Sequence, residues 1–410
     1  TKIALYRENT VTLFGYNASQ KREYRLIVSF NEYVPKITIT TKAPIADKFN
    51  YVDASFVFSD FPGEETIETT GGIHGRGNST WLVYPKKPYR IKLSEAEKIF
   101  GMKKDKDWVL LAEYCDKSLM RNAYINTISK TVGLPGTIHV SLYLNGQYEG
   151  LYLLTEAVED GKNKVDIEPD GFIIENDNYW NQEPLYVRTD MQGRCYTFKY
   201  PDADDKEIVS GDDNFNYIKK FVDEMEYAIY YGDMANEAKG YRKYVDVDSW
   251  AKWFITQEIM GNLDTNPFLA LKTRGAKLEF YPVWDAEWSM GLASPGDNGW
   301  QVYPETPRYT VETEVWSHAF YFERLFQDPY FVKYVYDTWQ TFKAKLPEVR
   351  QAVAAEADYI KEAQVENFAR WDVLGKPISV GLYFFDTWEE EVAYIADWFD
   401  RRVDWFDSFI

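Results

Sequence analysis

Apolar and polar residues alternate through the first 70 residues of the chain. The alternation is clearest at residues 24–28 and 37–40. Because successive side chains of a β-strand point to opposite faces, a period of two predicts strands. Pro62-Gly63 predicts a turn between two of them. Residues 1–70 are therefore predicted to form a leading β-strand region.

The next 90 residues continue this β-rich pattern. Residues 140–144 and 148–154 flank Asn145-Gly146, a dipeptide that accepts the positive φ angles of a tight type I′ turn. This is the strongest hairpin signal in the chain, and residues 89–93 predict another strand. We therefore assign residues 71–160 to a β-rich N-terminal lobe.

Beyond Asp160 the pattern changes towards the helical period. Apolar residues recur at helical spacing over residues 218–229 and 250–260, and nearly everything from Trp316 onward has the helical pattern. One short strand is expected at residues 277–283. Residues 161–410 are predicted to form a helix-rich C-terminal lobe. A β-rich part followed by a helix-rich part indicates an α+β fold.

Charge and composition narrow the function. The chain has 410 residues, a hydrophobic content of 45% and a net charge of −19. These values are typical of a folded protein, and the negative charge argues against nucleic acids and anionic membrane surfaces as partners. An anionic nucleotide remains compatible with the charge, provided that a local cluster of Lys and Arg, usually with a divalent cation, receives it.

Cysteine and histidine are scarce. Cys115 and Cys195 permit one disulfide at most and cannot form a thiolate metal site. His74, His139 and His318 are widely scattered, which argues against a zinc site, and structural roles are expected for His139 and His318. No apolar run approaches the ~20 residues of a membrane span, and no signal peptide is recognised at the first residue.

Two motifs of the first lobe suit an anionic ligand. The glycines around Arg76 and Asn78 in residues 74–81 would let backbone N–H groups approach phosphate, although such clusters more often form turns. In the strand at residues 85–93, Arg90 and Lys92 share one face and apolar residues the other. A phosphate-binding stripe and an ordinary amphipathic strand with solvated charges both fit that pattern.

The second lobe carries two acidic motifs. Asp264 and Asn266 follow the end of a predicted helix, while Asp285 and Glu287 follow the predicted strand 21 residues later, counted from Asp to Asp. Oxygen ligands at the ends of neighbouring elements suit Mg²⁺. An isolated Asp before a turn is more often a helix cap, so the argument rests on the set of acids.

The order of these motifs resembles the CotH kinase family of spore-coat proteins. The resemblance extends over about residues 35–410 and rests on an ordered set of motifs. In this sequence the motifs are Arg76-Gly77-Asn78-Ser79-Thr80-Trp81, Pro85-Lys86-Lys87-Pro88-Tyr89-Arg90-Ile91-Lys92, Asp116-Lys117-Ser118-Leu119-Met120-Arg121-Asn122, Tyr143-Leu144-Asn145-Gly146, Gly150-Leu151-Tyr152 with Glu156, Asn262 with Asp264, and Pro282-Val283-Trp284-Asp285.

The resemblance implies an atypical protein-kinase-like fold that binds ATP with Mg²⁺ or Mn²⁺ and transfers phosphate to a Ser, Thr or Tyr hydroxyl of a protein. It also implies an extracytoplasmic location, either secreted or on the bacterial surface. Asp264 would orient the attacking hydroxyl, and Asp285, Glu287 and Asn266 would hold the metal. The nucleotide would contact Arg76, Asn78, Arg90, Lys92 and Glu156, with Lys92 or Arg90 as the phosphate-holding cation.

Two other functions remain open at this point. A non-catalytic coat or surface protein could keep the kinase-like scaffold, since fold does not fix function. A glycan-active enzyme would use Asp264 and Asp285 as its two carboxylates, but the basic strand from Lys86 to Lys92 would then have no role. Phosphoryl transfer needs mainly positioning and charge neutralisation, so the scarcity of His and Cys does not count against it.

Overall fold

The computed structural model describes most of the chain in two compact units. It describes residues 9–16, 21–28, 34–130, 136–157, 160–161, 164–203, 206–262, 267–281, 286–292, 304–305, 321–378 and 383–410. Unit 1 comprises Thr1–Ala112, Ile138–Thr155 and Asp358–Asp372. Unit 2 comprises Glu113–Thr137, Glu156–Ala357 and Val373–Ile410.

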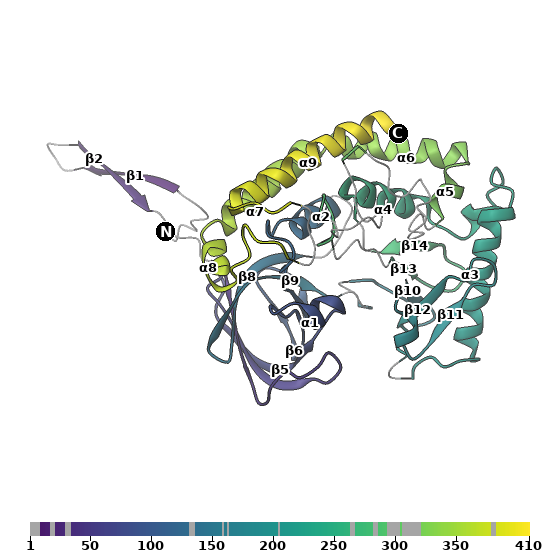
Figure 1. Ribbon diagram of the computed structural model, residues 1–410, viewed down its shortest axis with the longest axis horizontal. Helices are drawn as coiled ribbons and strands as arrows, with labels where there is room; N and C mark the ends of the chain where they lie inside the picture. Colours follow the sequence, from purple (N-terminus) through teal and green to yellow (C-terminus); the bar gives the residue numbers. More distant parts are fainter. Residues whose placement is uncertain are drawn as a thin grey trace. The chain divides into compact units, whose positions relative to one another are not determined.

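The elements confirm an α+β protein (Figure 1). The described strands are β1 (Asn9–Tyr16), β2 (Lys21–Val28), β3 (Lys36–Thr41), β4 (Val52–Ser59), β5 (Ile67–Gly75), β6 (Tyr89–Lys98), β7 (Lys104–Leu111), β8 (Thr137–Leu144), β9 (Gln147–Glu156), β10 (Phe172–Asn176), β11 (Tyr186–Arg188), β12 (Cys195–Tyr200), β13 (Phe268–Leu271) and β14 (Leu278–Tyr281). The described helices are α1 (Ser79–Val83), α2 (Arg121–Lys130), α3 (Asp213–Tyr231), α4 (Val247–Met260), α5 (Phe322–Leu325), α6 (Pro329–Lys343), α7 (Leu346–Ile360), α8 (Ala363–Arg370) and α9 (Trp388–Phe409), with 3₁₀ turns η1 (Trp180–Gln182) and η2 (Tyr241–Lys243).

Unit 1 is built on a closed barrel of seven strands in the order β3-β4-β5-β6-β7-β9-β8. Strands β3 and β8 close it by parallel pairing, with Lys36 opposite Ser141. Its interior is apolar and includes Phe56, Ile91 and Trp108, all fully buried. The alternating pattern of the first 70 residues predicts strands in the region of β3 to β5. It does not predict the closure of the barrel, which depends on pairings between distant segments. The predicted strands near the N-terminus also include β1 and β2, which form a separate two-stranded sheet.

The glycine cluster of the sequence lies mainly inside a strand. Gly71, Gly72 and Gly75 belong to β5 rather than to a turn, and only Gly77 lies in the loop that follows. A Cβ on Gly71 would lie 2.3 Å from the carbonyl oxygen of Lys92 on the neighbouring strand. The turn interpretation, which concerned residues 74–81, is therefore wrong for Gly75. At Gly71 a glycine is needed for the close approach of β6.

The predicted hairpin is confirmed. Asn145 and Gly146 join β8 to β9 with φ angles of 50° and 79°, as a type I′ turn requires. The Asn145 carboxamide oxygen also accepts a hydrogen bond of 2.9 Å from the Thr41 N–H of β3. The same residue therefore shapes the turn and helps to join β3 to the hairpin.

Unit 2 contains a five-stranded sheet in the order β11-β12-β10-β13-β14. One face packs on helices, as shown by Phe172 stacked on Tyr217 of α3 and Phe280 against Trp250 of α4. The sequence predicted helix beyond Asp160 and only one short strand, so the strands β10 to β13 are a correction. These strands are three to six residues long. Strands β10, β12 and β13 carry no clear alternation because both of their faces are largely buried, and the three residues of β11 are too few to show a pattern.

The long helices follow the sequence closely. The predicted apolar positions of α3 and α4 are buried, and an Asp side chain caps the N-terminus of each helix. Helix α9 begins with a capping box formed by Thr387 and Glu390 and buries Ile395, Phe399 and Val403. Cys115 and Cys195 carry thiols rather than a disulfide. Of the helices in the described ranges, none combines the length and the apolar character needed to cross a membrane.

Candidate functional site

The sheet of unit 2 brings together one flank of each acidic motif. Strand β13 begins at Phe268, two residues after Asn266, and β14 ends at Tyr281, four residues before Asp285. Phe268 and Tyr281 are directly paired in the antiparallel ladder. Asp264, Asn266 and Asp285 themselves lie outside the described residues. The start of β13, which follows the first acidic loop, therefore lies beside the end of β14, which precedes the second.

The other flanks of these two loops are also joined. Helix α4 ends at Gly261, whose φ of 54° is left-handed and whose N–H caps the last carbonyls of the helix. The Met290 N–H, beyond the second loop, donates a hydrogen bond of 2.9 Å to the Met260 carbonyl at the end of α4. Each flank of the first loop therefore contacts a flank of the second loop.

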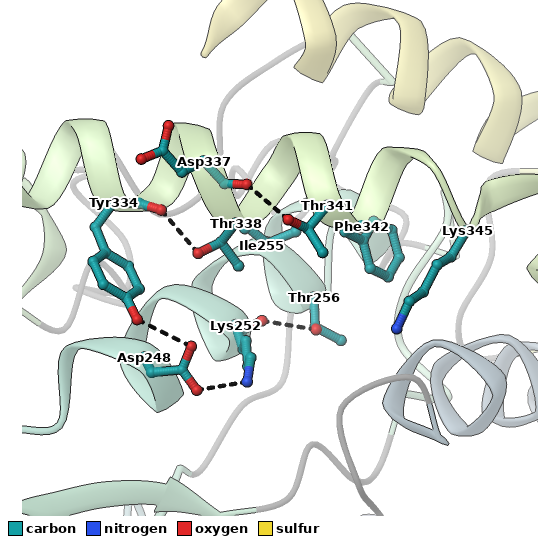
Figure 2. A pocket seen from close by; sticks show the side chains of 10 residues that line it. All are labelled: Asp248, Lys252, Ile255, Thr256, Tyr334, Asp337, Thr338, Thr341, Phe342 and Lys345. Carbon is teal, nitrogen blue, oxygen red and sulfur yellow. Dashed lines mark hydrogen bonds and ion pairs between the residues drawn. The ribbon is translucent and has the colours of Figure 1, made fainter.

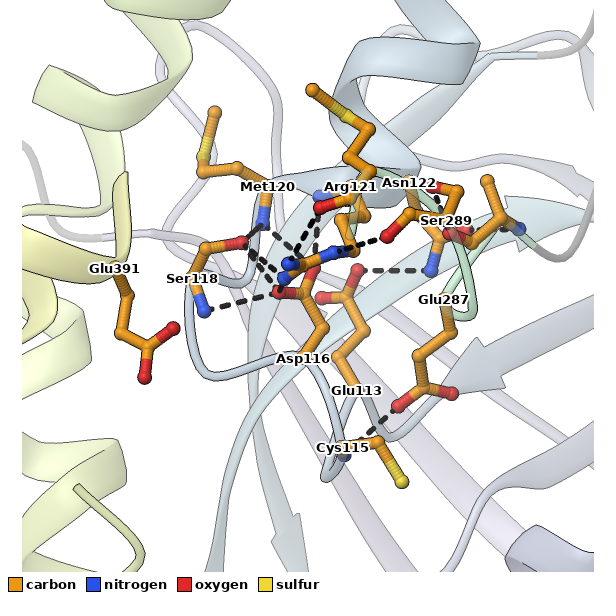
Figure 3. Close-up of polar contacts among 12 residues, drawn as sticks. Glu113, Cys115, Asp116, Ser118, Met120, Arg121, Asn122, Glu287, Ser289 and Glu391 are labelled. Atoms are coloured by element: carbon orange, nitrogen blue, oxygen red, sulfur yellow. Dashed lines mark hydrogen bonds and ion pairs between the residues drawn. The ribbon is translucent and has the colours of Figure 1, made fainter. Parts of the chain in front are cut away.

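The N-terminus of α2 forms a buried polar cluster beside this second flank (Figure 3). The Asp116 carboxylate accepts hydrogen bonds from the N–H groups of Ser118 (3.0 Å), Met120 (3.1 Å) and Arg121 (2.8 Å). These N–H groups have no helical partner, so the carboxylate satisfies them and complements the helix dipole. The helix begins at Arg121, directly after these residues.

The guanidinium of Arg121 connects this helix to the segment after Asp285. It donates to the Asp116 carboxylate at 2.5 Å, to the Ser289 carbonyl at 2.8 Å and to the Met290 carbonyl at 3.2 Å. The Arg121 and Asp116 side chains are 2% and 0% exposed. A planar group with five fixed donors can serve all three acceptors at once.

Asn122 and Glu287 complete the connection. Asn122 accepts a hydrogen bond of 3.0 Å from the Ala286 N–H and donates one of 3.1 Å to the Glu113 carboxylate. Glu287, a predicted metal ligand, is buried and accepts a hydrogen bond of 3.0 Å from the Cys115 N–H. The residue directly after Asp285 is therefore fixed through its backbone, and Glu287 is fixed through its side chain (Figure 3).

Backbone strain is concentrated in the same cluster. Among seven described non-glycine residues with positive φ, Glu113 (50°), Leu119 (58°) and Met290 (48°) lie here. A non-glycine residue in the left-handed backbone region lowers the stability of the fold by about 1–3 kcal/mol, which the surrounding contacts must offset. Such residues gather where a site constrains the chain.

Two buried titratable groups lie near the cluster. Burial raises the pKa of Glu391, although the Phe385 N–H and the charge of Arg121 oppose the rise. Burial lowers the pKa of Lys117, whose ammonium donates to the Lys376 carbonyl at 2.5 Å. Both side chains are thus held in an environment that disfavours charge.

Glu156, a predicted nucleotide-side residue, is buried at the end of β9. Burial raises the pKa of Tyr281 to about 12, and the charge of Glu156 adds to that rise. The carboxylate therefore lies within electrostatic reach of the end of β14, the strand that precedes Asp285.

The predicted cations lie on the barrel of unit 1. Burial alternates along β6 as the sequence predicts, with Tyr89 and Ile91 inside, Lys92 exposed and Arg90 half-buried. Arg90 forms an ion pair of 3.3 Å with Asp107 on β7. A solvated Lys92 is compatible with a phosphate-binding stripe and with an ordinary amphipathic strand. The ion pair between Arg90 and Asp107 excludes neither interpretation.

The loop between β5 and β6 holds the other two predicted residues. The Arg76 N–H donates to the Pro88 carbonyl at 3.1 Å, and the Asn78 carboxamide oxygen accepts from the Lys48 ammonium at 2.5 Å. Burial lowers the pKa of His74, and the charges of Arg90 and Arg76 lower it further. The structure thus brings Arg76 and Arg90 to one basic region around His74.

Three polar residues with defined roles were not among the predicted site residues. They are Asp116, Arg121 and Asn122, which the sequence identifies only as members of one family motif. Their signal is the spacing, since an Asp five residues before an Arg at a helix start can cap the helix and bind the guanidinium. Lys86 was likewise taken for part of a basic strand, but it is buried and donates to the Leu151 carbonyl at 2.5 Å.

No metal-binding cluster is complete within the described ranges. No group of three His, Cys, Asp or Glu side chains suited to a metal occurs there. A groove of about 490 Å³ lies between α4 and α6, but none of the predicted site residues lines it (Figure 2). Asp248 in this groove is bound by Lys252 and Tyr334, so its charge is already neutralised.

Comparison with known proteins agrees with the order of motifs. No curated protein matches this chain. The family model described as CotH kinase protein matches residues 73–406, which include the barrel strands β6 and β7, the α2 cluster and the flanks of both acidic loops. The match extends over most of the chain, and the protein therefore belongs to the CotH kinase family.

Proposed function

We propose that the protein transfers the terminal phosphate of ATP to a Ser, Thr or Tyr hydroxyl of an extracytoplasmic protein, with a divalent cation. One observation carries the proposal. The loops that contain Asp264 and Asp285 are joined on both sides, by the Phe268–Tyr281 pair and by the hydrogen bond from Met290 to Met260. Two acids from separate sequence motifs are thereby tied to one framework.

The donor chemistry fits Mg²⁺ or Mn²⁺. Asp285, Glu287 and Asn266 supply only oxygen ligands, which these hard cations prefer. Glu287 is held by the Cys115 N–H through one carboxylate oxygen. The bound cation would neutralise phosphate charge, which is the main requirement of phosphoryl transfer.

The remaining roles belong to side chains of the chain itself. Asp264 would accept a hydrogen bond from the acceptor hydroxyl and orient it towards the phosphate. Lys92 or Arg90 would contact phosphate oxygens, while Arg76, Asn78 and Glu156 would contact the nucleotide. In this proposal residues 71–160 form the nucleotide-binding lobe and residues 161–410 the catalytic lobe of a kinase-like fold. The extracytoplasmic location rests on the family resemblance.

A thermal-shift titration tests binding. ATP with Mg²⁺ or Mn²⁺ should raise the melting temperature of the wild type, because a ligand at 100 times its Kd stabilises the native state by about 2.7 kcal/mol. Asp285→Asn should abolish most of the shift. If neither nucleotide nor metal changes the melting temperature at concentrations well above millimolar, the proposal is wrong and a non-catalytic scaffold takes its place.

Transfer of radiolabel from ATP to a protein hydroxyl then separates catalysis from binding. Asp264→Asn should keep the thermal shift and lose at least about 100-fold of the transfer rate, as loss of a general base typically does. A variant that transfers at the wild-type rate would remove Asp264 from the proposed mechanism.

A further inference from the structure

Two arginines are buried within the described part of the chain, and both lie in unit 2. Arg121 is 2% exposed and Arg402 is 0% exposed. Both donate to main-chain carbonyls as well as to a carboxylate. Their carbonyl acceptors are the notable feature, because they flank the two acidic loops.

Arg402 holds the helix end that precedes Asp264. From α9 it donates to the Glu258 carbonyl at 2.8 Å and to the Glu258 carboxylate at 3.0 Å. A third bond of 3.1 Å reaches the Pro304 carbonyl. Glu258 lies in the last turn of α4, and its carbonyl also accepts a hydrogen bond from the Gly261 N–H that caps the helix. The guanidinium therefore adds a second donor at this helix end.

Arg121 holds the segment that follows Asp285 in the same manner. Its acceptors are the carbonyls of Ser289 and Met290, and its anionic partner is Asp116. The two held segments also bond to each other, since the Met290 N–H donates to the Met260 carbonyl. One arginine therefore supports each side of a single contact between the loop flanks.

Stability alone does not account for these two ion pairs. Removing two charges from water costs about as much as their attraction returns, so a buried pair is weak evidence for a stabilising role. A fixed fork of donors does provide a defined position for the backbone it binds. The contacts thus fit a role in fixing the main chain before the first acidic loop and after the second.

We propose that Arg121 and Arg402 are paired positioning residues, each of which fixes the backbone beside one acidic loop. The proposal rests on the phosphoryl-transfer function above, in which Asp264 and Asp285 must be held in register. A displacement of about 1 Å at a reacting group can lower a rate by about 100-fold. Loss of either guanidinium should therefore reduce kcat strongly.

Hydrogen exchange tests the positioning role without any need for activity. Lysine keeps the charge but lacks the planar fork that reaches the Asp116 carboxylate and both carbonyls in one fixed geometry. Arg121→Lys should therefore increase amide exchange in residues 286–292 by at least about tenfold. Arg402→Lys should do so in residues 256–262. Arg324→Lys is the matched control, because Arg324 also donates to two main-chain carbonyls, those of Ile229 and Tyr230 at the end of α3.

Kinetics provide the second measurement. Both variants should lose about 100-fold in kcat, with KM for ATP within about threefold of the wild type, whereas Arg324→Lys should match the wild type in both. If Arg121→Lys does not fold, Asp116→Asn removes the anionic partner with little change of shape and should give the same local exchange.

The outcomes separate the two proposals. Unchanged exchange at residues 286–292 and 256–262 in the lysine variants would overturn the positioning role, whatever the activity. Exchange that increases uniformly along unit 2 would also overturn it, since that pattern indicates general destabilisation. Local exchange changes in a protein without phosphoryl transfer would retain the positioning role and refute the proposed kinase function.

Discussion

Ion pairs of the barrel in unit 1 and of the interior of unit 2 differ in their exposure to solvent. On the barrel of unit 1, Arg90 and Asp107 pair across neighbouring strands with side chains that are 35% and 11% exposed. In unit 2, Asp116 and Arg121 pair in the interior, as do Glu258 and Arg402. The barrel carries its charges outside an apolar core, whereas unit 2 places some of its charges within the core.

Backbone hydrogen bonding explains the difference. A closed barrel pairs the backbone of every strand with a neighbour, so its interior needs no polar side chains. Unit 2 contains helix ends and loop flanks whose carbonyls and N–H groups have no partner in regular structure. Arg121 and Arg402 supply donors there, and Asp116 supplies the acceptor. At the start of α2 and the end of α4, buried charge thus accompanies a fixed irregular backbone.

The largest expected effect concerns the buried pair. Asp116→Ala should lower the free energy of unfolding by about 3–5 kcal/mol, because it leaves the Arg121 guanidinium buried without its anion. Asp107→Ala, the matched change on the barrel, should cost less than about 1 kcal/mol, since Arg90 is partly solvated. Urea denaturation of the two variants measures both values. Equal losses would show that the contrast between the units has no energetic basis.

A middle-sized effect concerns a buried carboxyl of the unit 2 sheet. Glu175 on β10 lies 3.1 Å from Lys199 on β12, and burial raises the pKa of Glu175 to about 7. Lys199 opposes the rise, while Asp177 and Glu183 add to it. A carboxyl with a raised folded pKa stabilises the fold when protonated, and this stability is lost as pH rises through the folded pKa.

The wild type should therefore lose stability relative to Glu175→Gln between about pH 4.5 and pH 7. The loss corresponds to about 1.4 kcal/mol for each unit by which the folded pKa exceeds the unfolded one. Urea denaturation at several pH values measures it, with Glu183→Gln as the control for a more exposed neighbour. A difference that grows in the opposite direction would mean that Lys199 keeps Glu175 ionised.

Local pattern determines which parts of this fold the sequence predicts. Asn145-Gly146 specifies its turn through backbone conformations that few other residues accept. The buried stripe of α9 and the capping box at Thr387 are equally local. The closure of the barrel through the pairing of Lys36 with Ser141 joins residues about 100 positions apart, and no short pattern encodes such a contact. Strand β10 lacked alternation because it is buried on both faces.

The candidate site divides in the same way. The acidic residues of the ordered motifs led to the prediction of Asp264, Asp285 and Glu287 as site residues. The pairing of Phe268 with Tyr281 shows that the strands flanking the two acidic loops are neighbours. Arg121 was named from the sequence only as part of a family motif. Its burial depends on the carbonyls of Ser289 and Met290, about 170 residues later, so its role required the tertiary structure.

The smallest expected effect concerns His74 on the barrel. Burial lowers its pKa below the usual 6.5, as do Arg90 and Arg76, while the Gly75 carbonyl and Asp47 oppose the shift. A histidine with a lowered folded pKa contributes stability above its unfolded pKa, and that contribution is lost as pH falls through the folded value. The sign is thus the reverse of that for Glu175 in unit 2.

Proton NMR can follow this titration directly, because the chain contains three histidines. We expect a midpoint below 6.5 for His74 and an upward shift of roughly a few tenths of a unit in Arg90→Gln, since the arginine is partly exposed and solvent screens its charge. Lys92→Gln is the control, because Lys92 is not among the charges that act on His74. A midpoint at or above 6.5 would mean that solvent reaches the ring. The basic region around Arg76 and Arg90 would then be too well screened to attract a phosphate group by charge alone.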